Sequence, residues 1–200
     1  MLLFAAALAQ TAGCVSIRPV DTEQAARLPL YEERAARLRL QDSWALEGRL
    51  AISDDSDGGS GFLSWQQQPG VSRMDFHGAL GRGAWRLLAG LNGAELEFAD
   101  GRRYRADSID ELVRRQVGWQ VPVEALAWWV RGLAAPGNPQ QRVLDEEGRL
   151  SLLQQDGWHI EFGRYGVFDG EAMPARMTAR QRDRTVKLAI RKWDLSGSHE

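Results

Sequence analysis

Apolar and polar residues alternate along most of the chain from residue 42 onward. Trp44, Leu46, Leu50 and Ile52 are separated by polar or small residues, and later stretches repeat this two-residue period. Such a period places apolar side chains on one face of a β-strand and polar side chains on the other. The stretches predicted as strands are residues 44–53, 61–67, 73–77, 85–91, 94–98, 102–105, 149–154, 158–162, 175–180 and 185–193.

Turn signals separate these strands at short intervals. They are Pro69-Gly70, Asn92-Gly93, Asp100-Gly101, Asp156-Gly157 and the acidic run 54–59. Residues 134–141 and 164–174 carry prolines and glycines and are predicted as loops. Many short antiparallel strands with inserted helices favour a mainly β (α+β) fold, built as one strongly curved sheet or barrel.

Three stretches predict helices. Residues 22–40 are rich in Ala, Glu and Arg, and Pro29 is expected to split them into two segments. Ser108 and Glu111 have the spacing of a capping box, and an apolar stripe follows them as far as Gly118. The third stretch is residues 122–133.

Residues 122–133 form the most apolar of the predicted helices. Pro122 suits the first helical position, and Gly132 suits the turn after the last. One apolar stripe runs through Pro122, Leu126, Trp129, Val130 and Leu133. Two interpretations remain open: the helix packs on the sheet as plain core, or it covers a binding cavity as a lid, with Leu126 and Trp129 in the wall.

Composition narrows the class of protein. Two hundred residues with 44% apolar content suit one domain with a sizeable core. A formal charge of −2 gives no overall attraction to nucleic acid or to anionic lipid. The eight tryptophans suit either a core or a cavity for a bulky apolar ligand.

The single cysteine, Cys14, excludes an intrachain disulfide and ends an uncharged apolar lead. That lead is too short to span a bilayer and fits the apolar region of a secretory signal. Ala12 and Gly13 directly before the cysteine resemble the bacterial lipobox, in which the cysteine is acylated. Thr11, where Leu is usual, and the lack of a preceding Lys or Arg depart from that pattern.

We therefore expect a signal peptide over residues 1–13, an acylated Cys14, a tether over residues 14–21, one domain over residues 22–195 and a tail over residues 196–200. Val15 stands where an Asp commonly retains lipoproteins at the inner membrane. By resemblance to that sorting rule, the protein is expected at the periplasmic face of the outer membrane.

Catalytic and metal-binding patterns are weak in this sequence. His77, His159 and His199 share no short-range ligand spacing. Ser60 is followed two residues later by Phe62, where a nucleophile elbow needs glycine. We expect no enzyme, metal or cofactor.

Residues 78–83 interrupt the strand pattern with three glycines, and Leu80 is the only large apolar side chain among them. Glycines free the backbone for a protruding loop. An exposed leucine on such a loop can enter a bilayer interface; the alternative is an ordinary hairpin residue folded onto the core.

Several segments together resemble the LolB family of outer-membrane lipoprotein receptors. The most specific are the helix between Val121-Pro122 and Gly132-Leu133 and the element Met173-Pro174-Ala175-Arg176-Met177, combined with the lipobox. The other matching segments, in the family's order, are residues 44–52, 62–67, 79–81 and 101–107. The resemblance implies an incomplete antiparallel barrel of about eleven strands, covered by a few helices and enclosing an apolar cavity for acyl chains.

The resemblance also implies a function. Members accept acylated lipoproteins from the soluble carrier LolA and insert them into the outer membrane without ATP. Leu80, with Gly78, Ala79 and Gly81, matches the family's membrane-insertion loop, although Gly78-Ala79 stands where Asn-Pro is common. The residues expected to line the cavity are Leu50, Ile52, Trp65, Phe76, Leu87, Leu96, Phe98, Leu126, Trp129 and Ile160.

Alternation alone leaves open which strand face lines the cavity. The remaining alternatives are a soluble lipoprotein or lipid carrier of the same fold, a structural envelope lipoprotein, and a lipid-acting hydrolase, which the missing triad disfavours. We expect a monomer whose partners are LolA, lipoprotein cargo and the outer membrane, with no nucleic acid.

Overall fold

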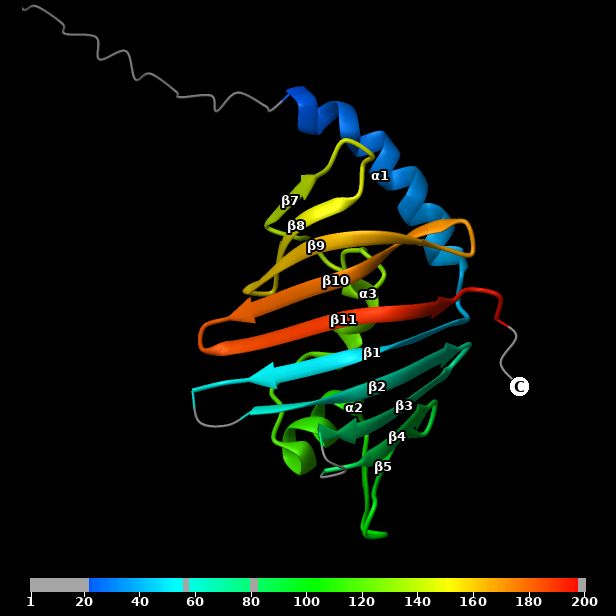
Figure 1. Cartoon of the computed structure of the whole chain (residues 1–200), viewed down its shortest axis with the longest axis vertical. Helices are drawn as coiled ribbons and strands as arrows, with labels where there is room; N and C mark the ends of the chain where they lie inside the picture. Colours follow the sequence, from blue (N-terminus) through cyan, green and yellow to red (C-terminus); the bar gives the residue numbers. More distant parts are fainter. Residues whose placement is uncertain (1–21, 56–57, 80–82, 198–200) are drawn as a thin grey trace, which may run out of the picture.

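A single antiparallel sheet organises the computed structural model, which describes residues 22–55, 58–79 and 83–197. The strands lie in the order β6-β5-β4-β3-β2-β1-β11-β10-β9-β8-β7, so the first and last strands meet at the centre (Figure 1). Their bounds are β1 Trp44–Ser53, β2 Gly58–Gln68, β3 Val71–Gly78, β4 Trp85–Gly90, β5 Gly93–Phe98, β6 Arg103–Ala106, β7 Gln141–Leu144, β8 Leu150–Gln155, β9 Trp158–Phe168, β10 Glu171–Gln181 and β11 Arg184–Asp194.

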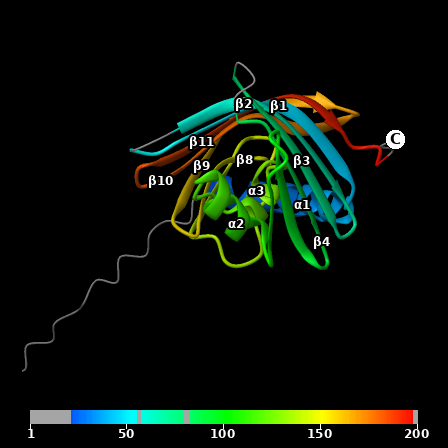
Figure 2. The same ribbon diagram turned by 90° about the horizontal axis from the view of Figure 1, so that it is seen from below.

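The sheet curves strongly, and the helices lie on its concave side (Figure 2). They are α1 (Thr22–Leu40), α2 (Ile109–Leu112) with the π-helical turn η2 (Val113–Val117), and α3 (Val123–Trp129). The predicted curved, incomplete barrel of eleven strands covered by helices is therefore confirmed. None of the helices within the described residues is long and apolar enough to cross a membrane.

The predicted alternation decides which face of each strand is buried. Along β1 the buried positions are Trp44, Leu46, Gly48, Leu50 and Ile52, as the two-residue period requires. The apolar side chains at these positions, all but Gly48, join those of the helices in one continuous apolar core. The concave face is thus the apolar face, and the convex face is polar.

The first helix differs from its prediction, because Pro29 does not split it. A proline inside a helix costs about 3 kcal/mol. Tertiary contacts on both sides of Pro29 offset that cost. Before it, Gln24 exchanges two hydrogen bonds with the backbone of Leu144; after it, Tyr31 and Ala35 are fully buried.

The predicted loop over residues 164–174 is wrong. β9 and β10 continue through it and turn only at Asp169 and Gly170, both with positive φ. Pro174 is accommodated next to a register shift in the β9–β10 pair, where a strand can lack a ladder hydrogen bond. The short edge strand β7 also differs from the prediction. Its first residue, Gln141, falls in the predicted loop 134–141, and the sequence pattern predicts no strand over residues 142–144.

Smaller differences concern helix α3 and the β4–β5 hairpin. The helix begins at Val123, one residue after Pro122, and Gly132 follows it with φ of 73°. Gly90 pairs with Gly93, so the loop residues are Leu91 and Asn92, and Leu91 is 95% exposed rather than part of a strand.

Candidate functional site

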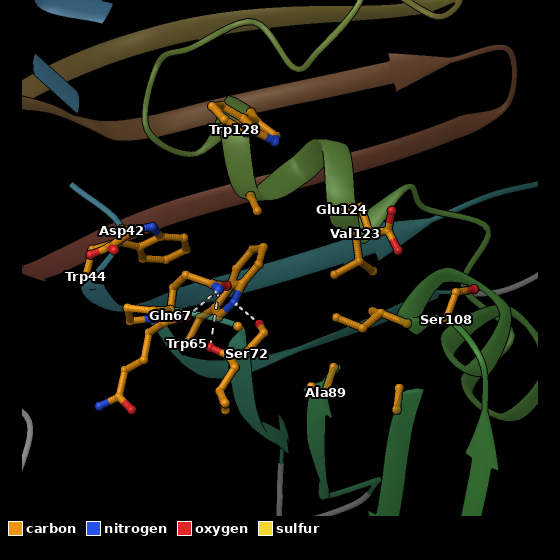
Figure 3. A pocket seen from close by; sticks show the side chains of 18 of the residues that line it. Asp42, Trp44, Trp65, Gln67, Ser72, Ala89, Ser108, Val123, Glu124 and Trp128 are labelled. Carbon is orange, nitrogen blue, oxygen red and sulfur yellow. Dashed lines mark hydrogen bonds between the residues drawn. The ribbon is translucent and has the colours of Figure 1, made fainter. Parts of the chain in front are cut away.

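An open cavity of about 440 Å³ lies between α3, the start of α2 and one end of the sheet (Figure 3). Val123, Ala127 and Trp128 line it from α3, and Ser108 and Ile109 from the start of α2. The β2–β3 and β4–β5 hairpins form the opposite wall, with Val71, Ser72, Ala89 and Ala94.

Two tryptophans form the inner wall of this cavity. Trp44 and Trp65 meet edge to face, with ring centroids 5.3 Å apart. The Trp65 indole Nε1 donates a hydrogen bond of 2.9 Å to Ser72 Oγ. This bond satisfies the polar atom of a buried ring, so the wall presents carbon surface.

Arg131 is a buried cation in the cavity wall. Its guanidinium donates to the carbonyl oxygens of Leu38, Gln41 and Ala127 over 3.0–3.3 Å. It also lies 4.8 Å from the ring centre of Trp128. Burial lowers the pKa of Arg131 to about 10. Among the described residues no carboxylate forms an ion pair with it, so carbonyl dipoles and ring faces stabilise the charge.

Helix α3 has one apolar face toward the cavity and another packed in the core. Trp129 is fully buried, its Nε1 donates to Gln155 Oε1 over 3.2 Å, and its ring centre lies 5.9 Å from that of Trp158. Leu126 belongs to the same core. The two residues predicted as cavity wall therefore face the sheet, whereas Val123 and Trp128 border the open space.

A second open cavity, of about 390 Å³, lies at the opposite end of the sheet. Phe76 and Phe98 line it together with Gly78 and Ala79 of the predicted insertion loop. Trp119 closes one side, 5.1 Å from the ring centre of Phe76. Leu80, Gly81 and the predicted anchor Cys14 lie outside the described residues.

Nine of the ten residues predicted to line one acyl cavity belong to one core cluster, and Phe98 packs against it, but the ten are distributed between different parts of the interior. Trp65 borders the first cavity, Phe76 and Phe98 the second, and Ile52 a pocket of about 60 Å³. The others are buried at the packed contact between sheet and helices: Leu50, Leu87, Leu96, Leu126, Trp129 and Ile160.

Sequence reasoning missed several cavity residues. The alternation of β1 places Trp44 on a buried face but does not place it at a cavity, and no sequence pattern marks Trp119, Trp128 or Arg131 as cavity residues. The large number of tryptophans, eight in 200 residues, was a signal in the sequence that some of them line a cavity. Nothing in the sequence distinguishes Arg131 from an ordinary basic residue at a helix end. In the described part of the chain, no group of three or more His, Cys, Asp or Glu side chains is arranged to hold a metal ion.

Comparisons with known proteins agree on one family. The family model described as "Outer membrane lipoprotein LolB" matches residues 42–193. The outer-membrane lipoprotein LolB of Pseudomonas aeruginosa is 37% identical over 194 residues, which is 96% of this chain and 95% of that protein. The LolB of Stutzerimonas stutzeri is 36% identical over 183 residues, or 91% and 89% of the two chains.

A solved structure shares the fold. It is that of a putative outer membrane lipoprotein-sorting protein domain from Vibrio parahaemolyticus, with a TM-score of 0.52. The alignment covers 88% of this chain and 95% of that chain at 11% identity. The likeness at this identity concerns the architecture alone.

Proposed function

Because the chain belongs to the LolB family of outer-membrane lipoproteins, we propose that it accepts acylated lipoproteins from the periplasmic carrier LolA and inserts them into the outer membrane. Family membership gives lipoprotein localisation at the outer membrane as its general role. The handover from the carrier and its independence of ATP are the proposal. Catalysis forms no part of it.

The observation that carries the proposal is the apolar interior with an open cavity at each end. The first cavity, at about 440 Å³, is within the usual range for ligand sites of about 300–1,000 Å³. Of the residues predicted for acyl chains, Trp65 borders the first cavity and Phe76 and Phe98 border the second, and most of the others are buried in the apolar core. We propose that the chains enter beside α3 and separate it from the sheet, so that these residues become the lining.

Physical chemistry explains why such a receptor needs no nucleotide. Burying an acyl chain stabilises it by about 0.8 kcal/mol per CH₂, so a lipoprotein requires a shielded path across water. A receptor that binds the chains more tightly than the carrier sets the direction of transfer by that difference alone.

Cargo transfer tests the proposal directly. Full-length protein with Cys14→Ala, which lacks the proposed acylation site, is incubated with carrier-bound lipoprotein. We expect the lipoprotein to co-purify with the receptor and Trp129→Ala to slow its transfer, since that ring lies between α3 and the sheet. Absence of transfer would contradict the proposal and favour a structural envelope lipoprotein. A normally folded Trp129→Ala protein that accepts cargo at the native rate would return α3 to a purely structural role.

We further propose that Cys14 is the lipid anchor and that Leu80 delivers cargo to the bilayer. Leu80→Glu is expected to keep cargo binding and to impair insertion into liposomes, because a carboxylate is costly in hydrocarbon. The matched control is Leu91→Glu, which changes an exposed leucine on another hairpin, where the loop joins β4 and β5. Equal insertion by both variants would refute the role of Leu80.

Mass spectrometry of the mature N-terminus tests the anchor. An acylated Cys14 is expected from the lipobox. An unmodified thiol there would favour a soluble carrier of the same fold.

A further inference from the structure

The convex face of the sheet carries two kinds of charge arrangement. Across β3 to β6, cations are paired with carboxylates on the same strand or on a neighbouring strand. Asp75 binds Arg73 and Arg86, Glu97 binds Arg103, and Glu95 binds Arg105. Each of these four arginines therefore has a carboxylate partner on the same face.

The other half of the convex face, across β1, β11, β10 and β9, concentrates cations around Ala189. Strand register places Arg49 and Arg176 on either side of Ala189, and Arg164 directly beyond Arg176. Lys187 and Arg191 lie two residues before and after Ala189 on β11. All five cationic side chains are exposed. We call these five residues and Ala189 the Ala189 patch.

The cations of the Ala189 patch lack anionic partners in the described part of the chain. None of the five forms an ion pair there, whereas the flanking residues Arg180 and Lys192 pair with Glu161 and Glu47. Arg191 instead lies over the ring of Phe62, 5.6 Å from its centre. An opposed pair of like charges, as at Arg164 and Arg176, destabilises a sheet. The arrangement therefore costs stability unless an external anion compensates it.

The shape of the patch suits a surface partner. The central strands form the convex side, and all the helices lie on the opposite side (Figure 2). The residue at the centre, Ala189, has only a methyl group. Gly163, which precedes Arg164 in the chain, has no side chain, and a Cβ there would lie 3.7 Å from the side chain of Arg176. Long cationic side chains thus surround a low centre. The protein's net charge of −2 makes this patch a local feature.

We propose that the Ala189 patch binds phosphate headgroups of anionic phospholipids at the membrane surface. Its charge is complementary to such a surface, and the protein's family resides at a membrane. Each Lys or Arg near an anionic surface strengthens attachment by about fivefold. The contact would orient the receptor on the membrane. It is separate from the acyl cavity and does not depend on cargo transfer.

Vesicle binding tests this proposal with two matched triple variants. Both are made in the full-length Cys14→Ala protein, so the residues ahead of α1 contribute equally. The first, Arg49→Gln/Lys187→Gln/Arg191→Gln, removes three cations of the patch. The second, Arg73→Gln/Arg103→Gln/Arg105→Gln, removes three paired cations from the same face, with the same change of net charge.

On vesicles of phosphatidylglycerol and phosphatidylcholine, the patch variant is expected to bind about a hundredfold more weakly than the parent protein. The second variant, which removes three paired cations, should bind these vesicles nearly as tightly as the parent protein. Raising the salt concentration should weaken vesicle binding by the parent protein and leave the weaker binding of the patch variant nearly unchanged. Circular dichroism verifies that all three are folded.

Three results would overturn the proposal. One is an equal loss of vesicle binding in both variants, which would mean that net charge alone, and not the position of the cations, determines binding. A second is equal binding of the parent protein to purely zwitterionic vesicles. The third is unchanged vesicle binding by the patch variant together with lost binding to the carrier protein, which would assign the patch to a protein partner.

Discussion

Asp110 fixes the beginning of the cavity-lining helix α3. Its Oδ1 accepts hydrogen bonds from the backbone N–H groups of Val123 at 2.7 Å and Glu124 at 3.2 Å. Pro122, at the N-cap position, has no side-chain donor or acceptor to do this. A residue of α2 thus caps the next helix and holds the two together at the cavity. Burial raises the pKa of Asp110, and the two backbone hydrogen bonds only partly offset that effect.

Replacing Asp110 with Ala should lower the free energy of unfolding by about 1 kcal/mol, the usual loss for a helix cap. Denaturant titration measures it. Asp107→Ala is the control, because it removes an exposed carboxylate close by in the chain. Equal stability of Asp110→Ala and the parent protein would show that the cap contributes nothing.

Asp75 makes stability depend on pH. Partial burial raises the pKa of this carboxyl, but hydrogen bonds from Arg86 and Arg73 lower it more, so the pKa lies below its ordinary value of 3.8. A lowered carboxyl pKa stabilises the folded state above the ordinary pKa, and the stabilisation is lost as pH falls through the folded-state value.

Asp75→Asn should therefore be less stable than the parent protein at pH 7, and the difference should shrink below pH 3.8. Urea titrations between pH 2.5 and 7 measure the two curves. A difference independent of pH would contradict the role given to this charge.

At the scale of elements, the end of α3 depends on Gly132. Its φ of 73° is in the left-handed region, and a Cβ there would lie 2.8 Å from the Tyr165 hydroxyl oxygen. That hydroxyl donates to the Leu150 carbonyl oxygen over 2.8 Å, which ties β9 to β8. A side chain at residue 132 therefore strains the backbone and presses on a strand contact.

Gly132→Ala should cost about 2 kcal/mol or more, from backbone strain and steric overlap. Gly101→Ala is the control. It also has positive φ, 85°, but no atom within 4 Å of the added Cβ, so only the backbone cost of about 1 kcal/mol applies. Thermal unfolding measures the stability of both variants. An equal loss of stability in the two would show that steric overlap with Tyr165 contributes nothing at residue 132.

Local sequence rules predicted most elements because those elements follow from local causes. The Ser108 hydroxyl accepts the Glu111 backbone N–H, as the capping-box spacing indicated. The buried face of β1 follows its two-residue period. The same rules failed at Pro29, because α1 is held by a distant partner, Leu144 of β7. They failed at residues 164–174 because β9 and β10 pair with each other as far as the turn at Asp169 and Gly170, despite the glycines and Pro174 in that stretch.

The candidate site was less predictable than the fold. Periodicity indicates that Trp65 and Leu50 share a face, but not that one borders a cavity and the other packs in the core. That distinction depends on where α3 lies across the sheet. Arg131 was unpredictable for a related reason, since its carbonyl partners Leu38 and Gln41 are far away in sequence.

At the scale of the whole molecule, two arginines join α1 to the segment that follows α3. Arg34 donates to the carbonyl oxygens of Arg131 and Ala172. Arg131 donates in turn to those of Leu38 and Gln41. These reciprocal bonds hold α1 against the open end of the curved sheet, where buried carbonyl groups would otherwise lack partners.

Arg34→Met keeps a long side chain of similar size but removes the donor to the carbonyl oxygens of Arg131 and Ala172, so it should cost about 2–3 kcal/mol. Hydrogen exchange should accelerate in α1 and near Gly132. The control, Arg37→Met, removes an arginine whose side chain is 53% exposed rather than 6%, and should cost less than about 1 kcal/mol. Equal protection of α1 in both variants would exclude the proposed joint.

The central pairing of β1 with β11 has a consequence for biogenesis. Leu50 lies opposite Leu188, so the middle of the sheet forms only when the last strand is available. Contacts between such distant residues slow folding, because a long loop must close before they form. A chain emerging from a translocation channel would carry two unjoined half-sheets, each with an exposed strand edge open to mispairing. Loss of β11 would therefore divide the sheet at its centre.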